Sequence, residues 1–187
     1  KFMQKSTYGL ILLYILLIGA FILNLDPNGG AFKDFKYHSL VANSFADNFY
    51  NTFFNYDKFA TRHSPVFYIF LSFFYKLELN ENIIRLIILH LGILLPFIFF
   101  KCLKFKYNHI NKDSLVIFSC IIILSPSFIS LTIWPDSRIF GLIFFCSSIY
   151  YFLKFKKKKK FAHTIKCIIF YSAASYLSPN FSLFSIF

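Results

Sequence analysis

The sequence is poor in acidic residues and lacks the common motifs for nucleotides and metals. Eight aspartates and glutamates stand against 20 lysines and arginines, so the formal net charge is +12. There is no GxxxxGK[ST] or GxGxxG loop to cradle phosphates, and the five histidines show no HxxxH or HExxH spacing. These absences argue against a nucleotide-loop enzyme and against a histidine metal site.

Paired cysteine motifs are lacking as well. Cys102, Cys120, Cys146 and Cys167 lie in or beside apolar segments without CxxC spacing. Cysteines in such surroundings pack as small apolar residues. We therefore assign them no disulfide and no metal.

The alternation of polar and apolar residues that marks half-buried β strands is also missing. Instead, 57% of the 187 residues are hydrophobic and 22% are aromatic, and the mean hydropathy of +0.60 exceeds what a soluble domain of this size can bury. Apolar runs of roughly 17 to 20 residues match the length of a membrane-crossing helix. The sequence predicts an all-α, polytopic membrane protein.

About five apolar runs are long enough to be expected as full spans. They are Tyr8 to Leu25, Ile83 to Phe100, Leu115 to about Ile133, Ile139 to Leu153, and a run that begins near Phe161. Residues 65–75 are also apolar, but at 1.5 Å per residue they cover only ~20 Å of a ~30 Å core. We expect this short segment to be re-entrant or partly inserted.

The lysines cluster beside these runs and set the expected topology. With residues 65–75 not crossing, the clusters at the N-terminus, at 101–112 and at 154–160 all fall on the cytoplasmic side; if they cross, the second cluster moves outside. We favour the first arrangement, with a cytoplasmic N-terminus. The charge then reflects topology and contact with anionic membrane lipids, and no nucleic-acid partner is implied.

The chain begins with Lys1 and ends at Phe187 within an unfinished apolar run. We interpret residues 1–187 as a single transmembrane domain in fragment form, with the C-terminal part of the fold missing.

Residues 26–64 form the expected first external loop, the stretch richest in groups that can do chemistry. Within it, residues 31–53 are amphipathic at 100° per residue, as in a helix lying on a membrane surface. The expected apolar face consists of Ala31, Phe35, Ala42, Phe49 and Phe53, and the polar face of Lys33, Asn43, Ser44, Asp47 and Asn51.

Asp34 and His38 are four residues apart, so they are neighbours on this helix, at the edge of its apolar face. A carboxylate partly desolvated at a membrane surface has a raised pKa and can act as a general base towards a hydroxyl. A solvated loop aspartate is the plain alternative.

Asp136 follows Pro135 and opens a later span. It can cap that helix, and capping is compatible with function. A charge at the mouth of a span is costly enough to suggest a role, and pairing with Arg138 is a further option.

Lys58, Arg62 and His63 cluster just before Pro65. Such groups hold a phosphate at a membrane interface, although basic side chains there also simply extend towards water. Arg85, near the start of a span, could serve the same phosphate or a helix end.

Three motifs carry a resemblance to a known family. They are an acid in the first external loop (residues 29–34, GGAFKD), a proline-initiated segment like PPLxYxL (63–71, HSPVFYIFL) followed by N-E-x-x-x-R (80–85), and a Pro-Asp that opens a later span (134–137, WPDS). In this order the sequence resembles the GT-C superfamily of membrane glycosyltransferases, particularly bacterial relatives of the dolichyl-phosphate-mannose protein mannosyltransferases and lipid A aminoarabinose transferases.

The resemblance implies a GT-C-like helical bundle with an amphipathic juxtamembrane helix in the first external loop. It further implies transfer of a sugar from a polyprenyl-phosphate donor to a hydroxyl of a lipid, glycan or protein, at the non-cytoplasmic face of a bacterial inner or plasma membrane. Carried over, Asp34 and Asp136 are catalytic, and Lys58 and Arg62 lie near the donor phosphate. We place His38, His63 and Arg85 with the substrate-binding groups.

No cofactor is firmly expected. Some relatives of this architecture use a divalent cation and others do not, so two separated aspartates leave a metal open. Two other interpretations stay open: a non-enzymatic transporter or flippase subunit, and an inactive fragment. A transporter would place polar residues near the middle of its spans, whereas most charges here lie at the edges of the apolar runs.

Overall fold

The computed structural model describes residues 2–26, 29–61 and 63–186, and every regular element within them is helical. The elements are α1 (Phe2–Ile22), α2 (Gly30–Asp47), α3 (Phe49–Phe54), η1 (Tyr56–Phe59), α4 (Pro65–Lys76), α5 (Glu81–Gly92), α6 (Leu94–Lys106), α7 (Lys112–Cys120), η2 (Ile121–Leu124), α8 (Pro126–Ile133), α9 (Ser137–Lys158), α10 (Phe161–Leu177) and η3 (Pro179–Ile186). The expected all-α class is therefore confirmed for the described residues.

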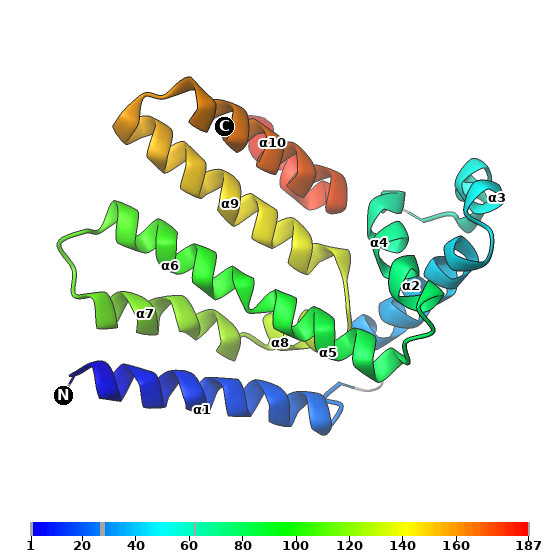
Figure 1. Cartoon of the computed structure of the whole chain (residues 1–187), viewed down its shortest axis with the longest axis horizontal. Coiled ribbons are helices and arrows are strands. Elements are labelled where there is room, and N and C mark those ends of the chain that lie inside the picture. Colours follow the sequence, from blue (N-terminus) through cyan, green and yellow to red (C-terminus); the bar gives the residue numbers. More distant parts are fainter. Residues whose placement is uncertain (1, 27–28, 62, 187) are drawn as a thin grey trace.

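The long helices form a bundle with a small helical layer at one end (Figure 1). Helices α1, α7, α6, α9 and α10 lie side by side in that order, and α2, α3 and α4 gather at the end where α9 begins. The N-terminus of α1 and the lysine-rich ends of α6 and α9 lie together at the opposite end. The bundle thus has a basic end and an end that carries the α2–α4 layer.

Among the described residues, two helices are long and apolar enough to cross a membrane, or three if a bent pair of helices counts as one span. The two are Glu81–Lys106, which runs through α5 and α6, and Ser137–Lys158. The shorter apolar helices Thr7–Ile22 and Pro65–Lys76 do not reach that length, as expected for the second of them. Length and composition make these helices candidates for membrane spans, and the number of spans stays a prediction.

The expected span from Leu115 to about Ile133 is a bent pair of helical segments. The helix is interrupted at Ser125, and the axes of the segments Lys112–Leu124 and Pro126–Ile133 differ in direction by 66°. Pro126 begins the second helix, because a proline has no amide hydrogen to donate and its ring clashes with the preceding helical turn.

The expected helix over residues 31–53 is also divided. It ends at Asp47, and the Asn48 side chain caps α3. Three of the predicted apolar positions lie in α2 and are buried, namely Ala31, Phe35 and Ala42. Phe49 and Phe53 lie in α3 and are exposed, because the break takes them off the α2 face that packs on α4.

Arg85 joins three parts of the chain at the end of the bundle. Its buried guanidinium donates through Nε to the Ile133 carbonyl at 2.9 Å and through Nη2 to Asn24 Oδ1 at 2.8 Å. The Trp134 ring lies 3.7 Å from the guanidinium carbon, and its Nε1 donates to the Leu25 carbonyl at 3.0 Å. Arg85 thereby fixes the end of α1 and the turn after α8 against α5.

We predict that Arg85→Leu lowers the free energy of unfolding by roughly 2–4 kcal/mol, since buried acceptors would lose their donor. Arg85→Lys should cause a smaller loss, because an ammonium cannot reach several acceptors in a planar fork. Unfolding in detergent micelles measures both. Wild-type stability in Arg85→Leu would show that the arginine is not structural and would return it to the phosphate-binding role.

Candidate active site

The cluster at the start of α9 is built from a helix cap. Asp136 Oδ1 accepts a hydrogen bond from the Arg138 backbone amide at 2.7 Å, so the carboxylate satisfies a free amide at the end of the helix. A negative group there also complements the helix dipole. The local pattern Pro135-Asp136 therefore places a carboxylate at this end of the bundle.

The Arg138 side chain then turns back and bonds two carboxylates. Its Nε donates to Asp136 Oδ1 at 2.8 Å, and its Nη2 donates to Asp136 Oδ2 at 2.6 Å and to Asp34 Oδ2 at 2.8 Å. Bonds of this charge-assisted kind are short and strong. The two aspartates expected to be catalytic are thus brought together from α2 and α9 by one guanidinium.

The two carboxylates differ in environment. The Asp136 side chain is 1% exposed, whereas the Asp34 side chain is 52% exposed. Burial raises the pKa of Asp136, but nearby His38 and the bonds from Arg138 outweigh it and hold this pKa well below its ordinary value. Asp136 therefore stays ionised and anchors Arg138, while Asp34 keeps its other carboxylate oxygen, Oδ1, for a ligand.

Two histidines stand behind the carboxylates. His38 Nε2 lies 3.6 Å from Asp136 Oδ2, longer than a hydrogen bond, and the side chain is buried. His63 Nδ1 lies 3.2 Å from Ser137 Oγ, and its ring stands edge-on to His38 with 5.6 Å between centroids. Burial and the neighbouring His38 lower the pKa of His63, so its imidazole is neutral at pH 7.

A polar cavity of about 380 Å³ opens beside Asp34 and Arg138. It is lined by Asp26, Gly30, Ala31, Asp34, Pro126, Ser127, Ser130, Leu131 and Arg138. Only Asp34 and Arg138 of the cluster face it, because Asp136 lies behind them. A hydroxyl-bearing ligand in this cavity would meet the exposed carboxylate first.

The other expected binding residues are placed differently. Lys58 is exposed in η1 and makes no recorded contact with the cluster, and Arg62 lies outside the described residues. Arg85 bonds protein oxygens beneath Trp134 rather than facing the cavity. The sequence predicted Arg138 only as a partner of Asp136. Its position two residues after a helix-capping aspartate could also have marked it as a residue of the site.

The space between the two carboxylates holds the guanidinium of Arg138. Among the described residues, no group of three or more His, Cys, Asp or Glu side chains is arranged to hold a metal ion. Comparison of the chain with protein-family models, curated proteins and solved structures gives no match. The resemblance to the GT-C superfamily therefore stays a hypothesis, and the site is interpreted from its own geometry.

We predict that Asp136→Asn lowers the free energy of unfolding at neutral pH. The difference in this free energy between the variant and the wild type should become smaller in acid. The pKa of Asp136 is lower in the folded protein than in the unfolded chain. The ionised carboxylate therefore stabilises the fold fully above the ordinary pKa of about 3.9, and this stabilisation is lost as the pH falls towards the pKa of the folded state. The loss begins below about pH 3.9, so unfolding measured from pH 8 down to about pH 2 tests this. Asp47→Asn, at the exposed end of α2, is the matched control, and a difference that widens in acid would contradict the ion cluster.

Proposed function

We propose that the protein is a membrane glycosyltransferase that moves a sugar from a polyprenyl-phosphate donor to a hydroxyl of a lipid, glycan or protein. The observation that carries this proposal is the Asp34–Arg138–Asp136 cluster beside a polar cavity at one end of an apolar helical bundle. A donor with a lipid tail explains why such a site belongs in a membrane protein.

In the reaction, the acceptor hydroxyl oxygen forms a bond to the anomeric carbon of the sugar while the bond from that carbon to the phosphate oxygen breaks. Asp34 takes the hydroxyl proton, and the polyprenyl phosphate leaves with the bonding electrons. Negative charge grows on the phosphate in the transition state, so a fixed cation nearby lowers the barrier. Arg138 fits this role, since its Nη1 makes no hydrogen bond within the described residues.

Asp136 and the histidines support these two groups. Asp136 fixes the Arg138 fork with two hydrogen bonds and compensates its charge. His63, half-buried and neutral, borders the cluster from the start of α4 and can bond a phosphate or sugar oxygen. Lys58 and Arg62 precede it in the chain and remain expected to lie near the donor phosphate.

The proposal places this site on the non-cytoplasmic side. The basic ends of α6 and α9 lie at the far end of the bundle from α2 and α4 (Figure 1), and lysines favour the cytoplasmic side of a membrane. A multi-pass protein of a bacterial inner or plasma membrane with its N-terminus inside would therefore present the cavity outwards.

We expect Asp34→Asn to slow transfer by about 10²- to 10⁴-fold, because the amide cannot accept the proton. Release of polyprenyl phosphate from a panel of labelled polyprenyl-phosphate hexoses and pentoses, in membranes that contain the native acceptor, measures turnover. Asp47→Asn makes the same change on the same helix away from the cluster and should leave the rate of transfer unchanged. Equal rates for both variants would remove Asp34 from the mechanism.

Single cysteines in a chain whose four native cysteines are replaced by alanine test the orientation. Asn43→Cys on α2 and Ser127→Cys at the polar cavity should react with a membrane-impermeant thiol reagent in intact cells. Asn108→Cys and Lys157→Cys, both exposed at the basic end, should react only after the cells are opened. Labelling of Asn43→Cys and Asn108→Cys from one side would refute the topology.

A further inference from the structure

The hairpin formed by α9 and α10 carries positive charge that nothing within it balances. All eight acidic residues of the chain precede Ser137, whereas residues 137–187 contain seven lysines. Six of these lysines fall within residues 154–160, where α9 ends and α10 begins, at the basic end of the bundle (Figure 1). A local excess of one sign of charge attracts ligands of the other sign.

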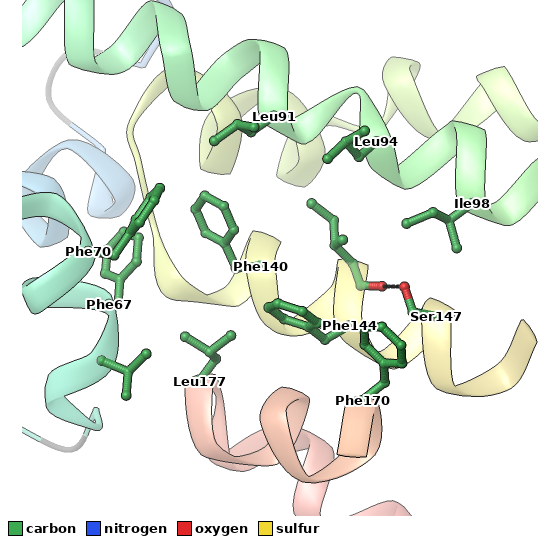
Figure 2. Close-up of a pocket in the computed structure, with 12 residues that line it drawn as sticks. Phe67, Phe70, Leu91, Leu94, Ile98, Phe140, Phe144, Ser147, Phe170 and Leu177 are labelled. Atoms are coloured by element: carbon green, nitrogen blue, oxygen red, sulfur yellow. Dashed lines mark hydrogen bonds between the residues drawn. The ribbon is translucent and has the colours of Figure 1, made fainter. Parts of the chain in front are cut away.

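The two helices of the hairpin pack through aromatic rings. Phe170 of α10 stacks on Phe144 of α9, with 5.9 Å between centroids, and Figure 2 shows these two rings side by side. Phe170 also stacks on Tyr151 of α9, with 5.4 Å between centroids and 4° between planes. The packing therefore holds the Tyr151 ring against α10, just before the lysines that end α9.

Lysines from both helices meet at the Tyr151 ring. Lys154 Nζ and Lys166 Nζ each lie 5.5 Å from its centroid, and the His163 ring lies 6.2 Å from it. The His163 ring also experiences the positive charges of several lysines, namely Lys154, Lys158, Lys160 and Lys166. Like charges gathered in this way repel, so an anion bound among them would be stabilising.

The start of α10 has hydrogen-bonding groups without partners. His163 Nδ1 and Thr164 Oγ1 are buried atoms that form no hydrogen bond within the described residues. Lys160, the N-cap residue of α10, provides no side-chain cap. The first amides of a helix lack acceptors within it, and such a helix end is well suited to the oxygens of a phosphate.

The outer face of α10 is apolar and exposed. Phe161, Ile165, Ile168 and Ile169 recur at helical spacing on this face, and all four are exposed. Lys166 follows Ile165 directly, so an ammonium group lies at the border of the apolar face. A ligand that matches both features combines an anionic group with hydrocarbon chains.

We propose that the α9–α10 hairpin binds one anionic phospholipid. Its phosphate lies between Lys154 and Lys166 at the start of α10, and its acyl chains lie along the face that carries Ile165 and Ile168. The proposed topology places this lipid in the cytoplasmic leaflet, where anionic lipids attract lysines beside membrane helices. The site lies at the opposite end of the bundle from the ion cluster and does not depend on the proposed transferase (Figure 1).

The test is a titration of the full chain in detergent with dioleoyl phosphatidylglycerol. Native mass spectrometry measures the fraction of protein that carries one lipid. Lys154→Gln combined with Lys166→Gln should weaken binding by about 30-fold, since each lysine beside an anionic lipid contributes about fivefold. Lys154→Arg combined with Lys166→Arg keeps both charges and should bind within about threefold of wild type. Dioleoyl phosphatidylcholine has the same chains without the net charge and should bind about tenfold more weakly.

Lys101→Gln combined with Lys104→Gln is the matched control, because it removes the same charge from exposed positions of α6 at the same end. It should leave binding within about twofold of wild type. An equal loss in the two glutamine double variants would show a diffuse positive field and overturn a defined site. Equal binding of phosphatidylcholine would remove the role of the lysines.

The acyl chains are tested separately. Ile165→Ala combined with Ile168→Ala should weaken binding of phosphatidylglycerol by about fivefold, because apolar surface is lost from the outer face. Unchanged binding in this variant would contradict the placement of the chains. Displacement of the lipid by millimolar glycerol 3-phosphate would assign the lysines to a soluble phosphate and overturn the lipid site.

Discussion

Two arginines hold the turn between α8 and α9 from opposite sides, and the rest of the site depends on this turn. Arg85 bonds the Ile133 carbonyl and stacks on Trp134, while Arg138 bonds the Asp136 carboxylate. Trp134 in turn contacts Phe32 of α2, with 4.8 Å between ring centroids. The turn therefore positions α2 against the start of α9, so that Asp34 reaches Arg138. Without this packing the two aspartates would belong to separate surfaces.

The fold was predictable where a physical rule acts within one segment. Composition predicted helices, and the helical period predicted the burial of Ala31, Phe35 and Ala42. The breaks at Asn48 and at Ser125 escaped prediction, because an apolar or amphipathic pattern can continue across a cap or a proline while the backbone changes direction. Periodicity reports which residues avoid water and says little about where a helix bends.

The sequence indicated Asp34, Asp136 and a pairing of Asp136 with Arg138, but not the bond between Arg138 and Asp34. The two aspartates stand out because a carboxylate beside an apolar run is costly, and Arg138 joins them. Arg85 and Arg138 have similar sequence settings, each near the start of an apolar run, yet one bonds backbone and amide oxygens and the other two carboxylates. Only tertiary contacts distinguish these two arginines, and the contact between Arg138 and Asp34 spans 104 residues of sequence.

The charges of the cluster constrain how a donor can enter. Two carboxylates and one guanidinium together carry one net negative charge, and the polar cavity opens on the exposed carboxylate and on Arg138. A phosphate approaching through that cavity would meet Asp34 and be repelled. From α4 it would meet His63 instead.

The same distribution bears on the choice between transfer and transport. Ser119 on α7, Thr132 on α8 and Ser147 on α9 each donate to a carbonyl of their own helix. Such groups are satisfied locally and do not present free ligands along a path through the bundle. A translocation route needs polar groups near the membrane midplane that can bind a cargo in turn. Here the ionised groups that converge from separate helices lie at one end, which suits a reaction at the membrane surface better than passage across it.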